Sequence, residues 1–153
     1  KGVDIETAPF PGFPTDLQAP FTTLMTIANG ESKITETIFE NRMNHIYLLN
    51  EMGARIKLNK NVAHIKGVKT INGMNLVGSD LRSSAALIIA GIIAKGSSNF
   101  YGLEHLDRGY ENFELKLKNL GIKITREVSK STFEKNEYKI KTKSEKLSKL
   151  EAA

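Results

Sequence analysis

The chain repeats four residue types in order at an offset of 64 to 68 positions, and this repeat strongly constrains its fold. Each copy has an acid before a helical stripe, a glycine after it, an arginine near the next helix and a second glycine at that helix's end. The matched pairs are Asp16 and Asp80, Gly30 and Gly96, Arg42 and Arg108, and Gly53 and Gly121. We therefore predict two related units within residues 1–129, covering about 1–78 and 74–129.

The first copy alternates between strand and helix patterns. Helical stripes cover 17–28 and 45–52, and both end at a glycine. Strand patterns cover 3–7, 32–37, 54–58, 62–66 and 74–77, separated by short turn signals. The order is βαβαββ, which implies helices packed on sheets and hence an α/β fold.

The second copy contains a helix that is apolar on all sides. Residues 81–93 carry aliphatic side chains on both helical faces, so we expect this helix to be buried. A strand at 98–101, a helix from Tyr110 to Leu120 and a closing strand at 122–124 follow. The Lys/Glu-rich segment 130–153 has weak periodicity, and we expect a mobile tail or a frayed helix there.

The loop before the first helix presents a carboxylate. Three prolines between residues 9 and 14 stiffen the loop, and Asp16 follows them where the helical stripe begins. Thr15 and Gln18 have the spacing of a capping box, in which the threonine hydroxyl covers the first helical amides. If Thr15 is the cap, Asp16 is free for chemistry.

Composition narrows the possible partners. The chain of 153 residues is 40% hydrophobic and has no cysteine, which excludes disulfides and thiolate metal sites. The net charge is +5, but seven lysines against four glutamates in 130–153 account for +3 of it, so we expect no nucleic-acid partner. With no long apolar span, we expect no membrane partner and a cytoplasmic location.

The histidines do not suggest a cofactor. His45, His64 and His105 have no metal-ligand spacing to one another, so we expect packing or surface roles for them. We predict neither a metal nor an organic cofactor.

The repeated acids and arginines suggest a reaction between a hydroxyl and an anion. An acid at a helix start can accept a proton from a hydroxyl if a closed, dry site raises its pKa, although the helix dipole opposes that shift. Arginine binds carboxylate or phosphate oxygens in pairs. We expect Asp16, Arg42, Asp80 and Arg108 to share one face; the alternative is that each Asp–Arg pair only bridges loops within its own unit.

Four motifs carry a family resemblance. They are PGFPTDLQA at 11–19, ITETIFENR at 34–42, DLRS at 80–83 and HLDRGYE at 105–111. These motifs resemble the UDP-N-acetylglucosamine 1-carboxyvinyltransferase branch of the enolpyruvyl transferase family, and the match runs from about residue 1 to 127. The resemblance implies an inside-out α/β domain built from three βαβαββ units, of which this chain holds about two.

The resemblance also implies a function and site residues. The implied reaction moves enolpyruvyl from phosphoenolpyruvate to the 3-hydroxyl of UDP-N-acetylglucosamine, the first committed step of peptidoglycan synthesis. Asp16 matches the aspartate that contacts this hydroxyl and is the proposed base. The other implied sugar-nucleotide contacts are Ile38 and Phe39, and the positions implied to bind phosphoenolpyruvate or support its site are Arg108, Arg42, Asp80 and Arg82. On the residues alone, Ile38 and Phe39 read as core.

Some family features are absent from the chain. Pro20 and Met43 stand where the family usually has glutamine and phenylalanine, and the family's lysine–asparagine pair and catalytic cysteine match nothing here. We therefore expect the C-terminal portion of an enzyme, inactive alone, whose missing N-terminal domain is its partner. Two alternatives stay open: a non-catalytic sugar-nucleotide-binding module, and the related 3-phosphoshikimate 1-carboxyvinyltransferase.

Overall fold

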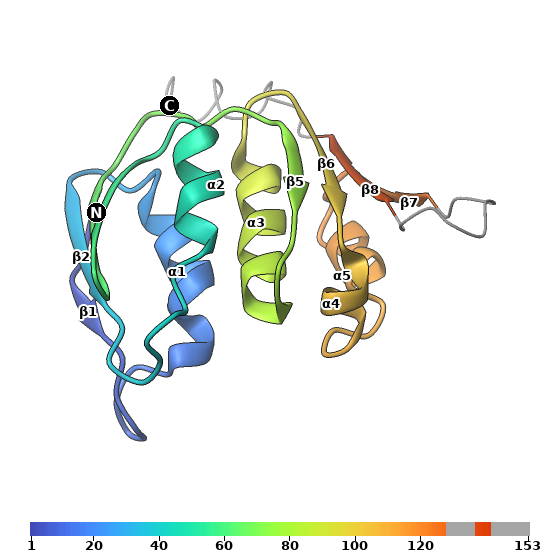
Figure 1. Cartoon of the computed structure of the whole chain (residues 1–153). Helices are drawn as coiled ribbons and strands as arrows, with labels where there is room; N and C mark the ends of the chain where they lie inside the picture. Colours follow the sequence, from blue (N-terminus) through green and yellow to red (C-terminus); the bar gives the residue numbers. More distant parts are fainter. Residues whose placement is uncertain (128–136, 142–153) are drawn as a thin grey trace.

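The computed structural model describes residues 1–127 and 137–141, whose strands form two four-stranded sheets (Figure 1). The first, in the order β1–β2–β4–β3, consists of β1 (Ile5–Glu6), β2 (Glu31–Thr35), β3 (Arg55–Asn59) and β4 (Val62–Lys66). The second, in the order β5–β6–β8–β7, consists of β5 (Asn75–Val77), β6 (Ser97–Tyr101), β7 (Ile124–Glu127) and β8 (Glu137–Lys141). In both sheets the first pair is parallel and the other pairs are antiparallel. The two sheets therefore share one strand order and one pattern of parallel and antiparallel pairs.

The main helices lie between the two sheets. Figure 1 shows α1 (Gln18–Met25), α2 (His45–Glu51) and α3 (Leu81–Ile93) in the middle of the molecule, with a sheet on each side. The 3₁₀ turn η1 (Thr15–Leu17) precedes α1, and α4 (Leu103–Asp107) and α5 (Phe113–Asn119) belong to the second unit. Helices inside and sheets outside agree with the expected inside-out α/β fold.

Helix α3 is the centre of the core, as its apolar composition predicts. Ala86, Leu87, Ile88 and Ala90 are fully buried. Small side chains let α1 approach closely, and the Thr23 hydroxyl of α1 donates to the Ala86 carbonyl of α3 at 3.3 Å. The two units therefore share one core across α1 and α3.

The four glycines of the repeat share a backbone conformation. Gly53 and Gly121 follow α2 and α5 with φ of 100° and 84°, a region that favours glycine. Gly30 and Gly96 precede β2 and β6 with φ of 110° and 95°. The sequence match therefore reflects equivalent turns in the two units.

The predicted capping box is wrong. Thr15 already lies inside η1, and its hydroxyl donates to Glu36 Oε2 at 2.8 Å instead of covering helical amides. The Gln18 amide donates to Thr22 Oγ1 at 2.9 Å and to Met43 Sδ at 3.1 Å. A buried carboxylate near Thr15 outcompetes the weaker local cap.

Two expectations for the second unit also need correction. Leu120 follows the end of α5 and is exposed, so it does not belong to the apolar stripe. Strand β8 lies within 130–153, so the expected mobile tail or frayed helix is wrong for residues 137–141 and the second unit extends past residue 129. Pairing with both β6 and β7 stabilises a strand whose own pattern is weak. The rest of that segment lies outside the described residues.

The helices are short for a membrane. Within residues 1–127 and 137–141, no helix has both the length and the apolar character to cross a bilayer.

Candidate functional site

Asp16 lies between two arginines that come from different units. Arg82 Nε donates to Asp16 Oδ1 at 2.5 Å, and Arg42 Nη1 lies 3.4 Å from the same oxygen. The Asp16 side chain is 62% exposed, whereas those of Arg42 and Arg82 are 17% and 32% exposed. The cluster therefore presents an accessible carboxylate held by two partly buried cations.

Asp80 places Arg82 at the start of α3. The Asp80 carboxylate is the N-cap of the helix, and its Oδ1 accepts from the backbone amides of Arg82 and Ser83 at 3.0 Å each. This cap fixes the first turn, from which the Arg82 side chain reaches Asp16. The acid of the second copy thus orders the arginine that meets the acid of the first copy.

Electrostatics keep Asp16 ionised. The hydrogen bond from Arg82 is the largest influence and holds the pKa of Asp16 below its usual value, while the charge of Arg42 acts in the same direction. The same contact raises the pKa of Arg82. Partial burial lowers the pKa of Arg42. The raised pKa expected for a general base is therefore not present in this state of the site.

A buried glutamate ties together the loops around Asp16. Glu36 is 1% exposed and follows β2. Its Oε1 accepts from the Thr7 hydroxyl at 2.9 Å and from the amides of Ile38 and Phe39 at 2.8 and 3.1 Å. Its Oε2 accepts from the Thr15 hydroxyl at 2.8 Å. One carboxylate thus fixes β1, η1 and the loop after β2 relative to one another.

Thr15 extends this network to the arginine. Arg42 Nη1 donates to Thr15 Oγ1 at 2.9 Å, while the Thr15 hydroxyl itself donates to Glu36. The Arg42 guanidinium also stacks over the Phe39 ring, 3.6 Å from its centroid. Arg42 is therefore held by a hydroxyl, an aromatic ring and the Asp16 carboxylate.

Ile38 and Phe39 are not core residues. They are 40% and 47% exposed, because Glu36 turns the chain outward after β2 by binding their backbone amides. The interpretation of these two residues as core is wrong. Their exposure beside Asp16 and Arg42 makes an apolar rim next to a charged centre.

Arg108 stands apart from this cluster. It follows α4 and is exposed, and within the described part of the chain it forms no ion pair. Its neighbour Gly109 packs so closely on Leu81 that a Cβ there would lie 2.7 Å from Leu81 Cδ2. The Arg108 segment therefore passes beside the start of α3 without Arg108 contacting Asp16.

The structure brings some of the repeated acids and arginines together and leaves others apart. Asp16 and Arg42 do pair within the first unit, as the second alternative states. The shorter contact joins Asp16 to Arg82 across the units, and Asp80 caps a helix instead of pairing with Arg108 among the described residues. Asp16, Arg42, Asp80 and Arg82 thus form the cluster.

Glu36 is the site-organising residue that sequence reasoning missed, and Thr15 was given the wrong role. Ser32, Ile34 and Glu36 occupy alternate positions and are all buried, so the strand pattern places Glu36 on the core side. An acid at such a position is unusual without partners. That mismatch between residue type and position was the available signal.

A buried histidine lies in the helical layer near this cluster. His45 begins α2 and is 1% exposed, and its Nε2 has no hydrogen-bond partner among the described residues. Burial lowers the pKa of His45 to about 4, although the charge of Asp80 opposes the shift. His45 is therefore neutral at pH 7.

Comparisons with known proteins agree with the fold and the motifs. Residues 1–117 match the family model described as EPSP synthase (3-phosphoshikimate 1-carboxyvinyltransferase). The whole chain is 93% identical to a Prochlorococcus marinus (strain AS9601) protein named UDP-N-acetylglucosamine 1-carboxyvinyltransferase, of which it covers 34%. A Synechocystis protein of the same name is 54% identical over 82% of this chain and 29% of its own length. The chain thus spans about a third of these curated relatives.

Solved structures show the same architecture. The enolpyruvyl transferase NikO from Streptomyces tendae superposes with a TM-score of 0.72 at 28% identity, over 79% of this chain and 28% of that one. EPSP synthase from Acinetobacter baumannii superposes with a TM-score of 0.64 at 15% identity over 84% of this chain and 28% of that one, which supports the fold alone. From the motifs, the fold and the family match over residues 1–117, the chain belongs to the EPSP synthase family of enolpyruvyl transferases.

Proposed function

We propose that this chain forms one wall of the cleft of an enzyme that transfers enolpyruvyl from phosphoenolpyruvate to the 3-hydroxyl of UDP-N-acetylglucosamine. The observation that carries the proposal is the accessible Asp16 carboxylate held between Arg42 and Arg82. The 93% identity to a relative with that name favours this substrate pair. Such an enzyme acts in the cytoplasm at the first committed step of peptidoglycan synthesis, and so supports cell-wall biogenesis, cell shape and division.

Asp16 suits the role of proton acceptor in this reaction. Transfer forms a bond between the sugar oxygen and an enolpyruvyl carbon and releases inorganic phosphate, so the hydroxyl must lose its proton. Asp16 is ionised and exposed, and it can accept that proton within hydrogen-bond distance of a bound hydroxyl. The exposed rim of Ile38 and Phe39 offers an apolar surface to the sugar nucleotide.

The arginines link cosubstrate binding to the basicity of Asp16. Arg82 and Arg42 now lower the pKa of Asp16, which makes it a weak base. A phosphate or carboxylate of phosphoenolpyruvate competes with Asp16 for the same guanidinium groups, assisted by the exposed Arg108. Binding of the anion therefore weakens the hold of Arg82 on Asp16 and raises its pKa, so that the base is activated when the cosubstrate is in place.

The partner of this wall is further polypeptide of the same enzyme. Leu17, Ile38 and Phe39 expose apolar surface beside Asp16, and the chain spans about a third of its relatives. Transition-state stabilisation depends on groups placed on all sides of the reacting atoms. We therefore expect no turnover from the 153-residue chain alone.

A chimaera tests the proposal. The chain is fused behind the upstream two thirds of the Prochlorococcus relative, and phosphate release is measured with phosphoenolpyruvate and UDP-N-acetylglucosamine. We expect turnover that Asp16→Asn abolishes, and none from the chain alone. Rapid turnover by the chain alone, or an active Asp16→Asn chimaera, contradicts the proposal. Sugar-nucleotide binding without turnover supports a binding module instead, and turnover only with shikimate 3-phosphate supports the sister enzyme.

A further inference from the structure

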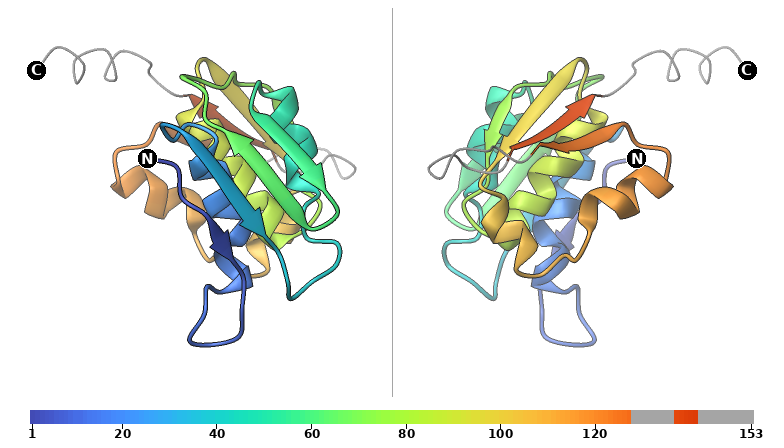
Figure 2. Two further views of the ribbon diagram at one scale, coloured as in Figure 1. Left: turned by 90° about the vertical axis from the view of Figure 1, so that its left-hand side faces the viewer. Right: turned by 90° about the vertical axis from the view of Figure 1, so that its right-hand side faces the viewer.

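The hairpin of β3 and β4 carries basic residues at four adjacent positions of one face. The register sets Arg55 opposite Lys66 and Lys57 opposite His64, and all four are exposed. The residues between them point the other way: Ile56 and Ile65 are buried against the helices. Figure 2 shows this sheet from its outer side. We name these four residues, Arg55, Lys57, His64 and Lys66, the basic lattice.

The basic lattice continues onto the next strand. Lys33 of β2 is the other register partner of His64, so that one row runs Lys57, His64, Lys33 across three strands. Neighbouring strands lie about 4.8 Å apart, and outward residues repeat about every 7 Å along a strand. Lysine, arginine and histidine side chains therefore stand on a regular grid, with spacings that contiguous phosphate groups can span.

This arrangement sets two like charges, Arg55 and Lys66, directly opposite each other. Like charges directly opposite each other destabilise a strand pair. Glu31 is the β2 partner of Lys66, yet no ion pair within 4.0 Å joins Arg55, Lys57 or Lys66 to a carboxylate in the described ranges. A bound anion offsets this repulsion, so anion binding stabilises the paired strands that carry the lattice.

The second unit shows that the fold does not require this charge pattern. Its equivalent hairpin has the same topology, and the exposed residues of β7 are Thr125 and Glu127. The exposed positions of β7 thus carry Thr125 and Glu127 where those of β3 carry Arg55 and Lys57, so the shared topology does not require a basic strand at this place.

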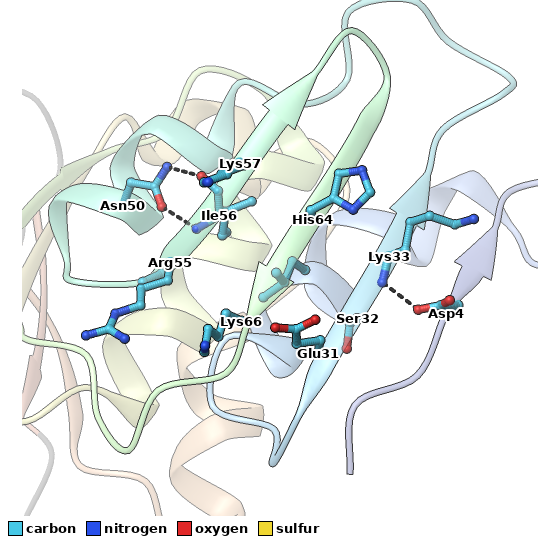
Figure 3. A pocket seen from close by; sticks show the side chains of 12 residues that line it. Asp4, Glu31, Ser32, Lys33, Asn50, Arg55, Ile56, Lys57, His64 and Lys66 are labelled. Atoms are coloured by element: carbon cyan, nitrogen blue, oxygen red, sulfur yellow. Dashed lines mark hydrogen bonds between the residues drawn. The ribbon is translucent and has the colours of Figure 1, made fainter.

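The lattice borders a hollow of about 900 Å³ on the outer face of the sheet (Figure 3). Arg55 and Lys57 lie on one side of it, Glu31 lies beside Lys66, and Asp4 lies on the far side next to Lys33. The volume suits a small ligand. A long acidic polypeptide crossing the hollow meets Asp4, whereas a compact ligand can place its negative charge over Arg55 and Lys57, away from Asp4.

We propose that this hollow binds a compact ligand with contiguous phosphate groups, which the basic lattice and Lys33 recognise. The ligand is a free polyphosphate or a nucleoside polyphosphate; for the latter, Asp4 and Glu31 offer acceptors to hydroxyl groups of the ribose. The site lies on the outer face of the sheet, whereas Asp16 and Glu36 lie beyond the end of β2, so the assignment does not depend on the enolpyruvyl transfer.

Calorimetric titration of the 153-residue chain tests the site, with tripolyphosphate and, separately, ATP without divalent cations. Low ionic strength is used because salt screens exposed charges. We expect saturable binding at one site, weakened about fivefold by Arg55→Gln or Lys57→Gln and abolished by the double variant. Equal affinity for tripolyphosphate and ATP identifies a free polyphosphate as the ligand. If ATP binds more tightly than tripolyphosphate and Glu31→Gln weakens ATP binding, the ligand is a nucleoside polyphosphate.

The matched control removes the same charge elsewhere. Lys116→Gln and Lys118→Gln together change two exposed lysines of α5, and binding is expected to be unchanged. Absence of saturable binding, or equal weakening by the control pair, overturns the proposal. Hexaglutamate binding as tightly as tripolyphosphate with the same dependence on Arg55 and Lys57 also overturns it, because the site then recognises acidic polypeptides.

Discussion

Arg82 Nε donates a hydrogen bond to Asp16 Oδ1 at 2.5 Å, and these two residues are 66 positions apart in the chain. Asp16 belongs to the first unit of the repeat and Arg82 to the second. The charged centre therefore exists only where the two units meet, over the ends of α1 and α3 that pack together in the core. Four predictions follow from this arrangement and from the buried groups near it.

Removal of the Arg82 guanidinium raises the pKa of Asp16. Arg82 is the largest cause of the lowered pKa, and Arg42 at 3.4 Å replaces only part of its effect. We expect Arg82→Gln to shift the Asp16 carboxyl titration, followed by ¹³C NMR, to higher pH. Arg126→Gln is the control because Arg126 pairs with Asp107, away from Asp16. An unchanged Asp16 titration in Arg82→Gln contradicts this account.

Glu36 stabilises the fold as well as the site. In Glu36→Ala, two hydroxyls and two backbone amides lose their acceptor, so we expect the free energy of unfolding to fall by about 3–5 kcal/mol. Glu36→Gln keeps one acceptor oxygen, and a loss of about 1–2 kcal/mol is expected. Urea unfolding followed by circular dichroism measures both.

The neighbouring Glu40 provides the control for Glu36. It is exposed and lies in the same loop, so Glu40→Gln is expected to change the free energy of unfolding by less than about 0.5 kcal/mol. Similar effects of Glu36→Gln and Glu40→Gln show that the hydrogen bonds of Glu36 contribute little.

His45 makes stability depend on pH below neutrality. Its pKa is about 4 in the folded state against 6.5 in the unfolded chain, so between these values the unfolded state binds a proton that the folded state does not. Stability therefore falls as pH falls from 6.5 towards 4, by about 3 kcal/mol. Urea unfolding at a series of pH values measures this slope.

Substitution of His45 identifies the source of that slope. His45→Gln removes the titrating group, and we expect a flatter dependence between pH 6.5 and 4, whatever its effect on stability at pH 7. His64→Gln is the control, because His64 is exposed and its variant is expected to keep the slope. Asp16 does not contribute to this slope. Its pKa is lowered on folding, so protonation of Asp16 reduces stability only at pH values below its usual pKa near 3.8. A full slope in His45→Gln overturns the assignment.

Asp80 contributes to stability through its cap. Asp80→Ala removes the acceptor for the amides of Arg82 and Ser83, and we expect the free energy of unfolding to fall by about 1 kcal/mol. Asp80→Asn keeps a capping oxygen and is expected to retain most of that stability. Equal losses in the two variants instead indicate that the charge of Asp80, and not its cap, is what stabilises the helix.

Most of the fold could be predicted from the sequence. The βαβαββ order, the buried helix α3 and the β3–β4 hairpin follow from local periodicity and turn residues, which depend on neighbours a few positions away. Strand β8 and helix α4 could not be predicted in this way. Strand β8 forms because β6 and β7 supply hydrogen-bond partners on both sides, and that is information from distant parts of the chain.

The site was predictable only in part. The repeat and the motifs identify four residues of the cluster: Asp16, Arg42, Asp80 and Arg82. They do not predict which of these side chains contact one another. The sequence favoured Thr15 as a helix cap and Ile38 and Phe39 as core, because those are the common local roles of such residues. Glu36 overrides all three roles, since a buried carboxylate binds whichever donors can reach it.

By itself, the sequence determined that two related α/β units exist, which turns require glycine, and which acids and arginines recur in them. Only the tertiary structure decided that Asp16 pairs most closely with an arginine of the other unit, and that Arg55, Lys57, His64 and Lys66 gather on one exposed face of the β3–β4 hairpin. The physical reason is distance: periodicity reports the environment of a residue within one element, whereas pairing of charges depends on which elements the core brings within a few ångströms.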